Sequence, residues 1–370
     1  MKKKANGKNA KAEKPLLEAV KQQADPLSPE AQLAVVRQIE AKLAATQAEL
    51  RVEAAKRAQA ESELLRVQER LDALCETRDS VEAAKLARMA KRTKGKASAI
   101  LCLCDWHAEG RVDSRMVDDA NRFDLDVAQK RISRVWHKTL YLLDFVKHIS
   151  NVDELVVWLG GDLINGIIHQ ELRETNFLGQ AEAVMFVQNE VATGLEFLKK
   201  EAPIDRITVV TNYGNHGRDG REKFINNAHN HSWEWVAYQN LAWYYKSDPK
   251  VAFKVEIGYH NWYTIHGHDI RFHHGDAIRY RGGVGGVTIP LHKKIAAWNQ
   301  RRKPCLDVLG HFHQFLDHWR YVVCGSLIGY DAYANYIAAE FQEPTQTFIV
   351  IDEQYGKVLA MPVFCKEANE

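Results

Sequence analysis

Five short apolar runs, each followed at once by polar residues, constrain the fold of this chain more than any other feature. They cover residues 99–104, 155–159, 207–211, 270–272 and 307–309. Each run has the length of a strand, and longer stretches with helical character lie between them, at 127–149, 180–200, 222–245 and 291–300. Two further short strands are expected at 263–265 and 321–323. The alternation predicts an α/β layered domain.

The residues that follow the five runs are those that bind metals. They are Asp105 and His107, Asp162, Asn215 and His216, His274, and His311 and His313. In layered α/β sheets, ligands bind in the crevice outside the carboxyl ends of the strands, so these side chains are expected to converge there. The alternate spacing of Asp105-x-His107 and of His311-x-His313 places both donors of each pair on one side of an extended segment.

The same residues form five ordered motifs: D-x-H, G-D-x-x-N, G-N-H, a single His followed by Gly, and G-H-x-H. In this order they resemble the calcineurin-like metallophosphoesterase superfamily, over residues 97 to about 364. Within it the chain is most similar to phage-encoded members with G-N-H-G-R and to recombination-repair nucleases. The resemblance implies a four-layer sandwich of two mixed sheets flanked by helices, with a helical or coiled-coil N-terminal arm ahead of it.

The resemblance also implies a centre of two divalent ions. One ion would be held by Asp105, His107, Asp162 and His313. The other would be held by Asp162, Asn215, His274 and His311, so that Asp162 bridges the two. Donors of this mixture suit Mn²⁺ first, with Fe²⁺, Zn²⁺ or Mg²⁺ as alternatives. The choice of His274 over its neighbour His273 rests on the resemblance alone, and His266 and His268 are interpreted as core or supporting residues.

Two ions about 3.5–4 Å apart would provide a bridging hydroxide for in-line attack on a phosphodiester. His216 would then protonate the leaving oxygen, and Arg218, with Arg221, would neutralise the phosphate. Arg279 and Arg281, in a glycine-rich loop, either contact substrate or belong to a plain connection. Gly217 stands where most relatives carry Asp or Glu, so His216 must be oriented from elsewhere.

The N-terminal quarter of the chain has a different character. Residues 1–28 form a Lys-rich tail that we expect to be disordered, and 29–95 form one long helix, because neither Gly nor Pro occurs from Glu30 to Lys94. Apolar residues on alternating three- and four-residue steps predict a coiled-coil seam. Its members are Ile39, Leu43, Leu50, Ala60, Leu64, Val67, Leu71, Leu74 and Val81. Self-association is favoured over a single exposed helix or a docking arm for another protein.

The formal net charge of +2 does not by itself argue for a polyanionic partner. Two local clusters of Lys and Arg, at residues 2–14 and 85–96, permit nucleic acid without requiring it. No run approaches the length of a membrane span, no leader follows the basic start, and the six cysteines form no C-x-x-C pair. We expect a cytoplasmic protein with no membrane partner.

The leading functional interpretation is a metal-dependent DNA nuclease in a catalytic domain at 96–370. One alternative is a phosphodiesterase or phosphatase for a small nucleotide, for which a closed pocket is expected in place of an open groove. Another is a coiled-coil assembly factor whose phosphoesterase domain binds nucleic acid with little turnover. A partner ATPase, common for repair nucleases of this type, is a further expectation from the resemblance.

Overall fold

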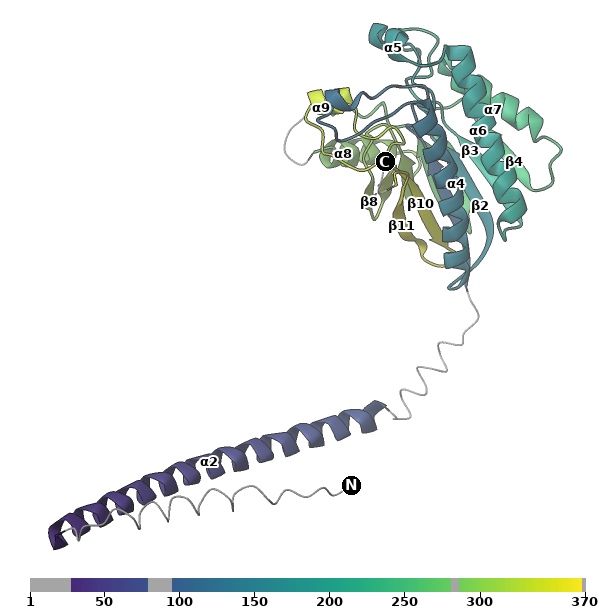
Figure 1. The fold of residues 1–370 in the computed structure, drawn as a ribbon. Coiled ribbons are helices and arrows are strands. Elements are labelled where there is room, and N and C mark those ends of the chain that lie inside the picture. Colours follow the sequence, from purple (N-terminus) through teal and green to yellow (C-terminus); the bar gives the residue numbers. More distant parts are fainter. Residues whose placement is uncertain (1–27, 79–94, 281–285, 368–370) are drawn as a thin grey trace. The chain divides into compact units, whose positions relative to one another are not determined.

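A six-stranded mixed sheet lies at the centre of the part of the chain that begins at residue 95 (Figure 1). The computed structural model describes residues 28–78, 95–280 and 286–367. The strand order is β11-β10-β1-β2-β3-β4, with β1 to β4 parallel and β10 and β11 antiparallel. The bounds are β1 Lys96–Leu103, β2 Asn151–Leu159, β3 Arg206–Thr211, β4 Val251–Val255, β10 Thr345–Asp352 and β11 Gly356–Phe364.

A second, five-stranded mixed sheet has the order β5-β6-β7-β9-β8, in which β6, β7 and β9 are parallel. Its strands are β5 Asn261–Ile265, β6 His268–His273, β7 Leu306–Leu309, β8 Leu316–His318 and β9 Tyr321–Val323. The helices of this part are α4 Leu125–Lys147, α5 Gln170–Thr175, α6 Gln180–Glu201, α7 Trp233–Tyr244, α8 Thr288–Trp298 and α9 Ala332–Tyr336. Short 3-10 turns cover Ser114–Met116 and Ala228–His231.

Alternation along β1 shows how the layers stack. Leu101 and Leu103 belong to a core shared with α4, α6 and α7, whereas Ile100 and Cys102 belong to a core shared with the second sheet. Successive side chains of a strand point to opposite faces, so the first sheet is covered by helices on one side and by the second sheet on the other. A third core packs Leu291 and its neighbours in α8 against the far face of the second sheet.

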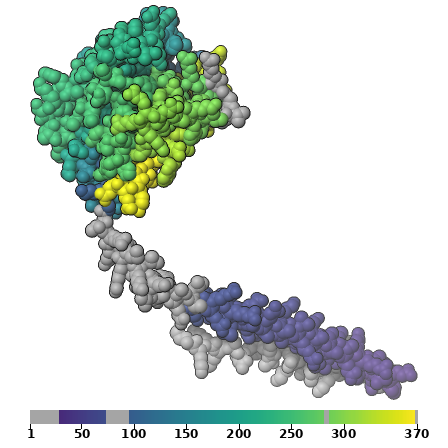
Figure 2. All heavy atoms as spheres, turned by 180° about the vertical axis from the view of Figure 1, so that it is seen from behind, coloured from purple at the N-terminus to yellow at the C-terminus, as the bar shows by residue number. Residues whose placement is uncertain are grey.

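These cores give four layers, helix, sheet, sheet and helix, as the sequence predicts. In space-filling view the C-terminal strands (yellow) adjoin the start of the part that begins at residue 95 (blue), as the pairing of β1 with β10 requires (Figure 2). Two mixed sheets flanked by helices are therefore established for this part of the chain.

Some expectations were wrong in detail. The helix predicted at 222–245 begins only at Trp233, because Ser232 caps it and the Asn-rich stretch before it forms turns and a 3-10 helix. Cys102, Cys104, Cys324 and Cys365 are buried free thiols, whereas Cys305 is exposed. Among the described residues no helix is both long and apolar enough to cross a bilayer.

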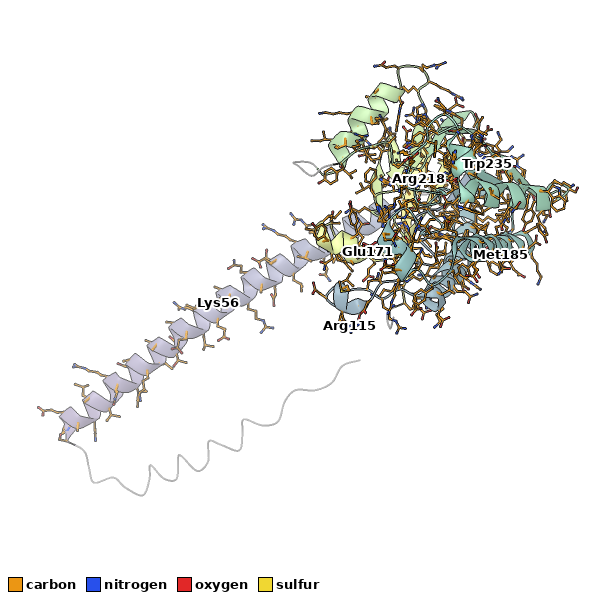
Figure 3. The ribbon with its side chains drawn as sticks, turned by 90° about the horizontal axis from the view of Figure 1, so that it is seen from above. Lys56, Arg115, Glu171, Met185, Arg218 and Trp235 are labelled. Atoms are coloured by element: carbon orange, nitrogen blue, oxygen red, sulfur yellow. The ribbon has the colours of Figure 1, made fainter. Side chains whose placement is uncertain are left out.

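The N-terminal unit contains one 50-residue helix, α2, at Pro29–Arg78. Its side chains project into solvent along its length, as Lys56 shows (Figure 3). The predicted seam is exposed, with Leu43 58%, Leu50 62% and Leu64 64% accessible. Contacts divide the chain into Met1–Arg92 and Thr93–Glu370. The basic tail, residues 79–94 with Val81, and the side chain of Leu74 lie outside what the structure describes, and the coiled coil stays a prediction.

Candidate metal centre

The carboxyl ends of β1, β2, β3, β6 and β7 meet at one edge of the two stacked sheets, and the polar residues that follow them come together there. Three groups of side chains have nitrogen or oxygen atoms within 4.8 Å of one another. The groups are Asp105, His107 and His313; His107, Asp162 and His216; and Asp162, His274 and His311. The remaining predicted ligand, Asn215, joins them through its Oδ1, 3.2 Å from Nε2 of His274. Asp162 is common to two groups, as a bridging carboxylate would be.

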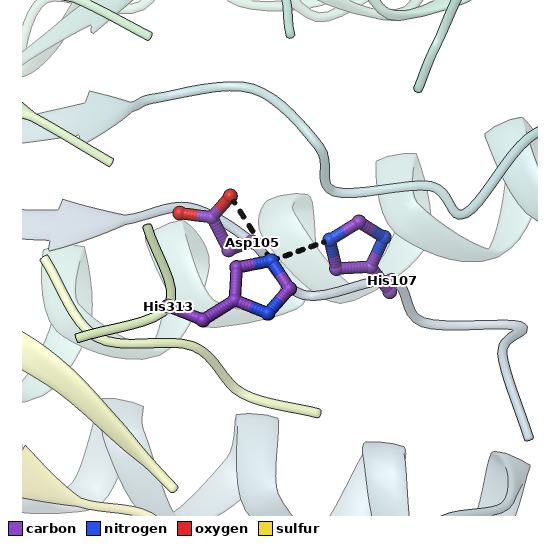
Figure 4. Close-up of side chains that lie close together, drawn as sticks. All are labelled: Asp105, His107 and His313. Atoms are coloured by element: carbon purple, nitrogen blue, oxygen red, sulfur yellow. Dashed lines mark hydrogen bonds and ion pairs between the residues drawn. The ribbon is translucent and has the colours of Figure 1, made fainter. Parts of the chain in front are cut away.

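At one end of the centre, three ligand-type atoms face one another (Figure 4). Nε2 of His107 lies 3.1 Å from Nε2 of His313, which lies 3.7 Å from Oδ1 of Asp105. That Oδ1 atom is buried and has no hydrogen-bond partner among the described residues. A buried carboxylate oxygen without a partner is costly, and a cation shared with the two imidazoles would satisfy it.

At the other end, His274 faces Asp162 and Asn215. Its Nε2 lies 3.0 Å from Oδ2 of Asp162, and its Nδ1 donates to the carbonyl of Gly160 at 2.8 Å. Burial opposes charge on this ring, but the Asp162 carboxylate raises the pKa of His274 to about 10. A divalent ion bound here would compete with this protonation, because an imidazole binds metal in its neutral form.

The pKa values of two other imidazoles of the centre, His107 and His311, are lowered, which favours their neutral forms at pH 7. Burial, followed by the charges of neighbouring histidines, holds the pKa of His107 well below its usual range and lowers the pKa of His311 to about 3. Burial raises the pKa of Asp105, whereas His274 and His216 overcome burial and hold the pKa of Asp162 well below normal. Neutral imidazoles and ionised carboxylates are the forms that bind metal.

Five of these residues have a left-handed backbone. The φ angles are 51° for Asp105, 46° for His107, 53° for Asp162, 73° for His311 and 55° for His313. Such a conformation costs a residue other than glycine on the order of 1–3 kcal/mol, and it is concentrated at functional sites. Because five candidate ligands share this strained conformation, we infer that the backbone is held so that their side chains point toward one another.

Asn165 orients two of the rings. Its side-chain oxygen accepts from Nδ1 of His107 at 3.0 Å, and its backbone carbonyl accepts from Nδ1 of His216 at 2.8 Å. Both Nε2 atoms are then free to face the centre. Asn165 is itself held, because its Nδ2 donates to Asn176 and its backbone amide donates to the buried Glu109. The sequence left open what orients His216, and the structure supplies this carbonyl.

Glu234, on α7, supports the loops from behind. Its buried carboxylate accepts from the amide of Leu163 at 2.6 Å and from the amide of Gly214 at 2.7 Å. A Cβ atom added to Gly217 would lie 2.7 Å from Cγ of Glu234. The acidic side chain of Glu234, which α7 supplies, thus fills the space beside residue 217. No sequence signal identifies it, since it follows the G-N-H motif by many residues.

The donor set fits two divalent ions. Asp105, His107, Asp162 and His313 would hold one, and Asp162, Asn215, His274 and His311 would hold the other. Imidazole, carboxylate and amide donors suit Mn²⁺, Fe²⁺ or Zn²⁺. His273 is outside all three groups, next to Asp307, while His266 contacts Ser98 and His268 contacts a backbone carbonyl.

The four arginines predicted to bind substrate do not all lie at one site. Arg218 and Arg279 line a cavity of about 800 Å³ that also contains Asn215. The Nε atom of Arg218 is buried and lacks a hydrogen-bond partner in the described part of the chain. Arg221 is exposed and donates to Gln170 at 3.3 Å, and Arg281 lies outside the described residues.

No protein-family model matches this chain, and no curated protein does. Among solved structures it is similar to Vps29 from Entamoeba histolytica complexed with Zn²⁺, at 11% identity and a TM-score of 0.29, over 72% of this chain and 99% of that one. A predicted phosphoesterase from Streptococcus pneumoniae TIGR4 gives 13% identity and 0.30, over 72% of this chain and 90% of that one. A hypothetical protein from Pyrococcus horikoshii OT3 is 12% identical with a TM-score of 0.36, and the match covers 73% of this chain and 89% of that one. Because these scores lie below 0.5, function is inferred from the residues of the site.

Proposed function

We propose that this chain is a metal-dependent phosphodiesterase with a two-ion centre, and that its substrates are the phosphodiesters of nucleotides, with DNA as the first to test. The observation that supports this most directly is the set of carboxylate oxygens and imidazole nitrogens that face one another at the sheet edge. When bound, two divalent ions supply a Lewis-acid centre that lowers the pKa of a water and polarises the phosphoryl group.

The chain's own residues have three roles in this proposal. Asp162 lies between the two sets of ligands, and its Oδ1 is fixed by the amide of His216 at 2.7 Å. The Nε2 atom of His216 faces the centre, so this ring is placed to give a proton to the leaving oxygen. Arg218 lines the cavity beside Asn215, so its guanidinium is placed to neutralise the phosphate.

The test is hydrolysis of bis-p-nitrophenyl phosphate, and then of labelled single- and double-stranded DNA, by metal-stripped protein titrated with Mn²⁺. Wild type should regain activity with Mn²⁺, and His313→Ala should lose at least about 100-fold, since it removes a metal ligand. His148→Ala is the matched control, because His148 is exposed at the end of α4, which leads into the opposite edge of the sheet. Activity that needs no metal, or that survives in His313→Ala, would overturn the proposal.

A phosphodiesterase for a small nucleotide is the second candidate, and one observation favours it. The cavity beside Asn215 has a volume of about 800 Å³, which is the size of pockets that hold small ligands. Cleavage of the small ester with both forms of DNA untouched would select this candidate.

A further inference from the structure

A cavity beside the metal centre has aromatic and basic side chains that take no part in the proposed hydrolysis. Its volume of about 800 Å³ lies within the range of pockets that hold small organic ligands. Asn215 belongs both to the predicted ligand set and to the cavity wall. A substrate whose phosphate reaches the centre would therefore place an attached group inside this cavity.

One wall of the cavity is apolar and aromatic. The ring of Phe224 stacks on His231, with centroids 3.7 Å apart and planes 10° from parallel, and Asp219 holds His231 through a 2.8 Å contact. Ile225 and Ile289 line the same space and are 83% and 44% exposed. Large apolar side chains exposed around a hollow indicate that a flat or apolar group is bound there.

The remaining wall is cationic. The cavity is lined by five basic side chains and a single carboxylate, Asp276, which is already paired with Lys223. The basic side chains are Arg218, Lys223, Arg279, Lys293 and Lys294. The excess of positive charge favours an anionic ligand, and the stacked aromatic wall favours a ligand with a flat ring.

We propose that this cavity binds the nucleoside on one side of the scissile phosphate, with the base against Phe224 and Ile225 and the phosphate between Arg218 and Asn215. The inference rests on the proposed phosphodiesterase function and assigns its substrate class. A nucleoside has both properties that the walls select, an aromatic ring and an attached anion. Stacking of a base on an aromatic side chain contributes about 1–3 kcal/mol, which is a factor of about 5 to 150 in affinity.

The test compares two esters with the same leaving group, thymidine 5′-p-nitrophenyl phosphate and methyl p-nitrophenyl phosphate, in Mn²⁺ and with the full chain. Wild type should prefer the thymidine ester in kcat/KM by at least about 5-fold. Ile225→Asp should abolish most of this preference, because it should lower kcat/KM for the thymidine ester far more than for the methyl ester. This side chain is so exposed that its replacement should leave the fold intact.

Ile149→Asp is the matched control, since Ile149 is 63% exposed and is not among the residues that line the cavity. Phe224→Ala should act as Ile225→Asp does. Equal loss on both esters, or no preference in the wild type, would overturn the nucleoside site. If neither ester is cleaved, the phosphodiesterase proposal fails, and binding of thymidine 5′-monophosphate to wild type and Ile225→Asp still decides whether the cavity holds a nucleotide.

A nucleoside can be presented by the end of a strand or by a free nucleotide. Oligonucleotides and dinucleotides separate these sources. Mononucleotides released from oligonucleotide ends would identify a strand end, and turnover confined to dinucleotides would identify a free nucleotide. In either arm Ile225→Asp should lower the rate and Ile149→Asp should not.

Discussion

Asn165 is the residue on which the orientation of the centre depends most. It fixes the ring of His107 through its side chain and the ring of His216 through its backbone. Asn165→Ala removes the contact with His107, together with the bond to Asn176, whereas the backbone contact with His216 is kept. We expect the affinity for Mn²⁺ to fall by about 10–100-fold, the usual cost of losing a residue that supports a ligand.

Calorimetric titration of the metal-stripped protein with Mn²⁺ measures this effect directly. Asn240→Ala, at an exposed position of α7, is the control that should bind as wild type does. An unchanged affinity in Asn165→Ala would mean that His107 is held by its neighbours alone.

Gly217 leaves space for the side chain of Glu234. Restoring the common residue by Gly217→Asp would drive a side chain into Glu234, so we expect a loss of about 1–3 kcal/mol in the free energy of unfolding. Adding Glu234→Ala opens the space, and the double variant should lose less than the sum of the two single variants.

Urea unfolding of the four proteins gives the interaction energy. Gly220→Asp is the control, because a Cβ at Gly220 would meet no atom within 4 Å. Strictly additive losses would show that residues 217 and 234 do not compete for one space.

At the scale of elements, the helix α2 is exposed on every described face, which an isolated helix in water rarely tolerates with this many leucines. We propose that it pairs with a second copy of the chain through the predicted seam. Leu50→Lys with Leu64→Lys places charges in that seam and should convert an oligomer to a monomer in sedimentation velocity. Ala55→Lys with Ala58→Lys, off the seam, should not. A monomeric wild type would exclude self-association.

The predicted strands are the five that end in ligand-type residues and the two short strands at 263–265 and 321–323, which the structure confirms as β5 and β9. β10 lies between β11 and β1 in the large sheet and was not predicted, although Thr345–Asp352 is almost fully buried. Its place depends on antiparallel pairing with β1, in which Ala97 meets Asp352 across a long stretch of sequence. β4, β8 and β11 likewise lie where no motif follows them, and short apolar runs alone do not separate strands from helices.

The candidate site, too, could be predicted from the sequence only in part. Spacing and order predict which side chains converge, because strand ends must meet at a sheet edge. The contacts that orient them, such as Asn165 with His216, depend on backbone carbonyls that carry no sequence identity. Glu234 reaches the loops only because α7 packs on the sheet, and packing of that kind is a property of the fold.

At the scale of the whole molecule, the two units defined by contacts divide the chain at Arg92 and Thr93. All described hydrophobic cores lie between Ala97 and Cys365. The first strand needs the few residues before it, because the carbonyl of Gly95 accepts from the amide of Asn151 at 2.8 Å. Removal of residues 1–92 should therefore leave a folded unit with its metal centre complete.

We expect this shortened chain to hydrolyse bis-p-nitrophenyl phosphate with the kcat/KM and Mn²⁺ requirement of the full chain, and to lose the oligomer. Loss of turnover would assign the N-terminal unit to the catalytic machinery. Retained turnover on the ester with impaired cleavage of DNA would assign it to delivering a long substrate, because the basic clusters at residues 2–14 and 85–92 would have been removed while the cavity beside Asn215 was kept.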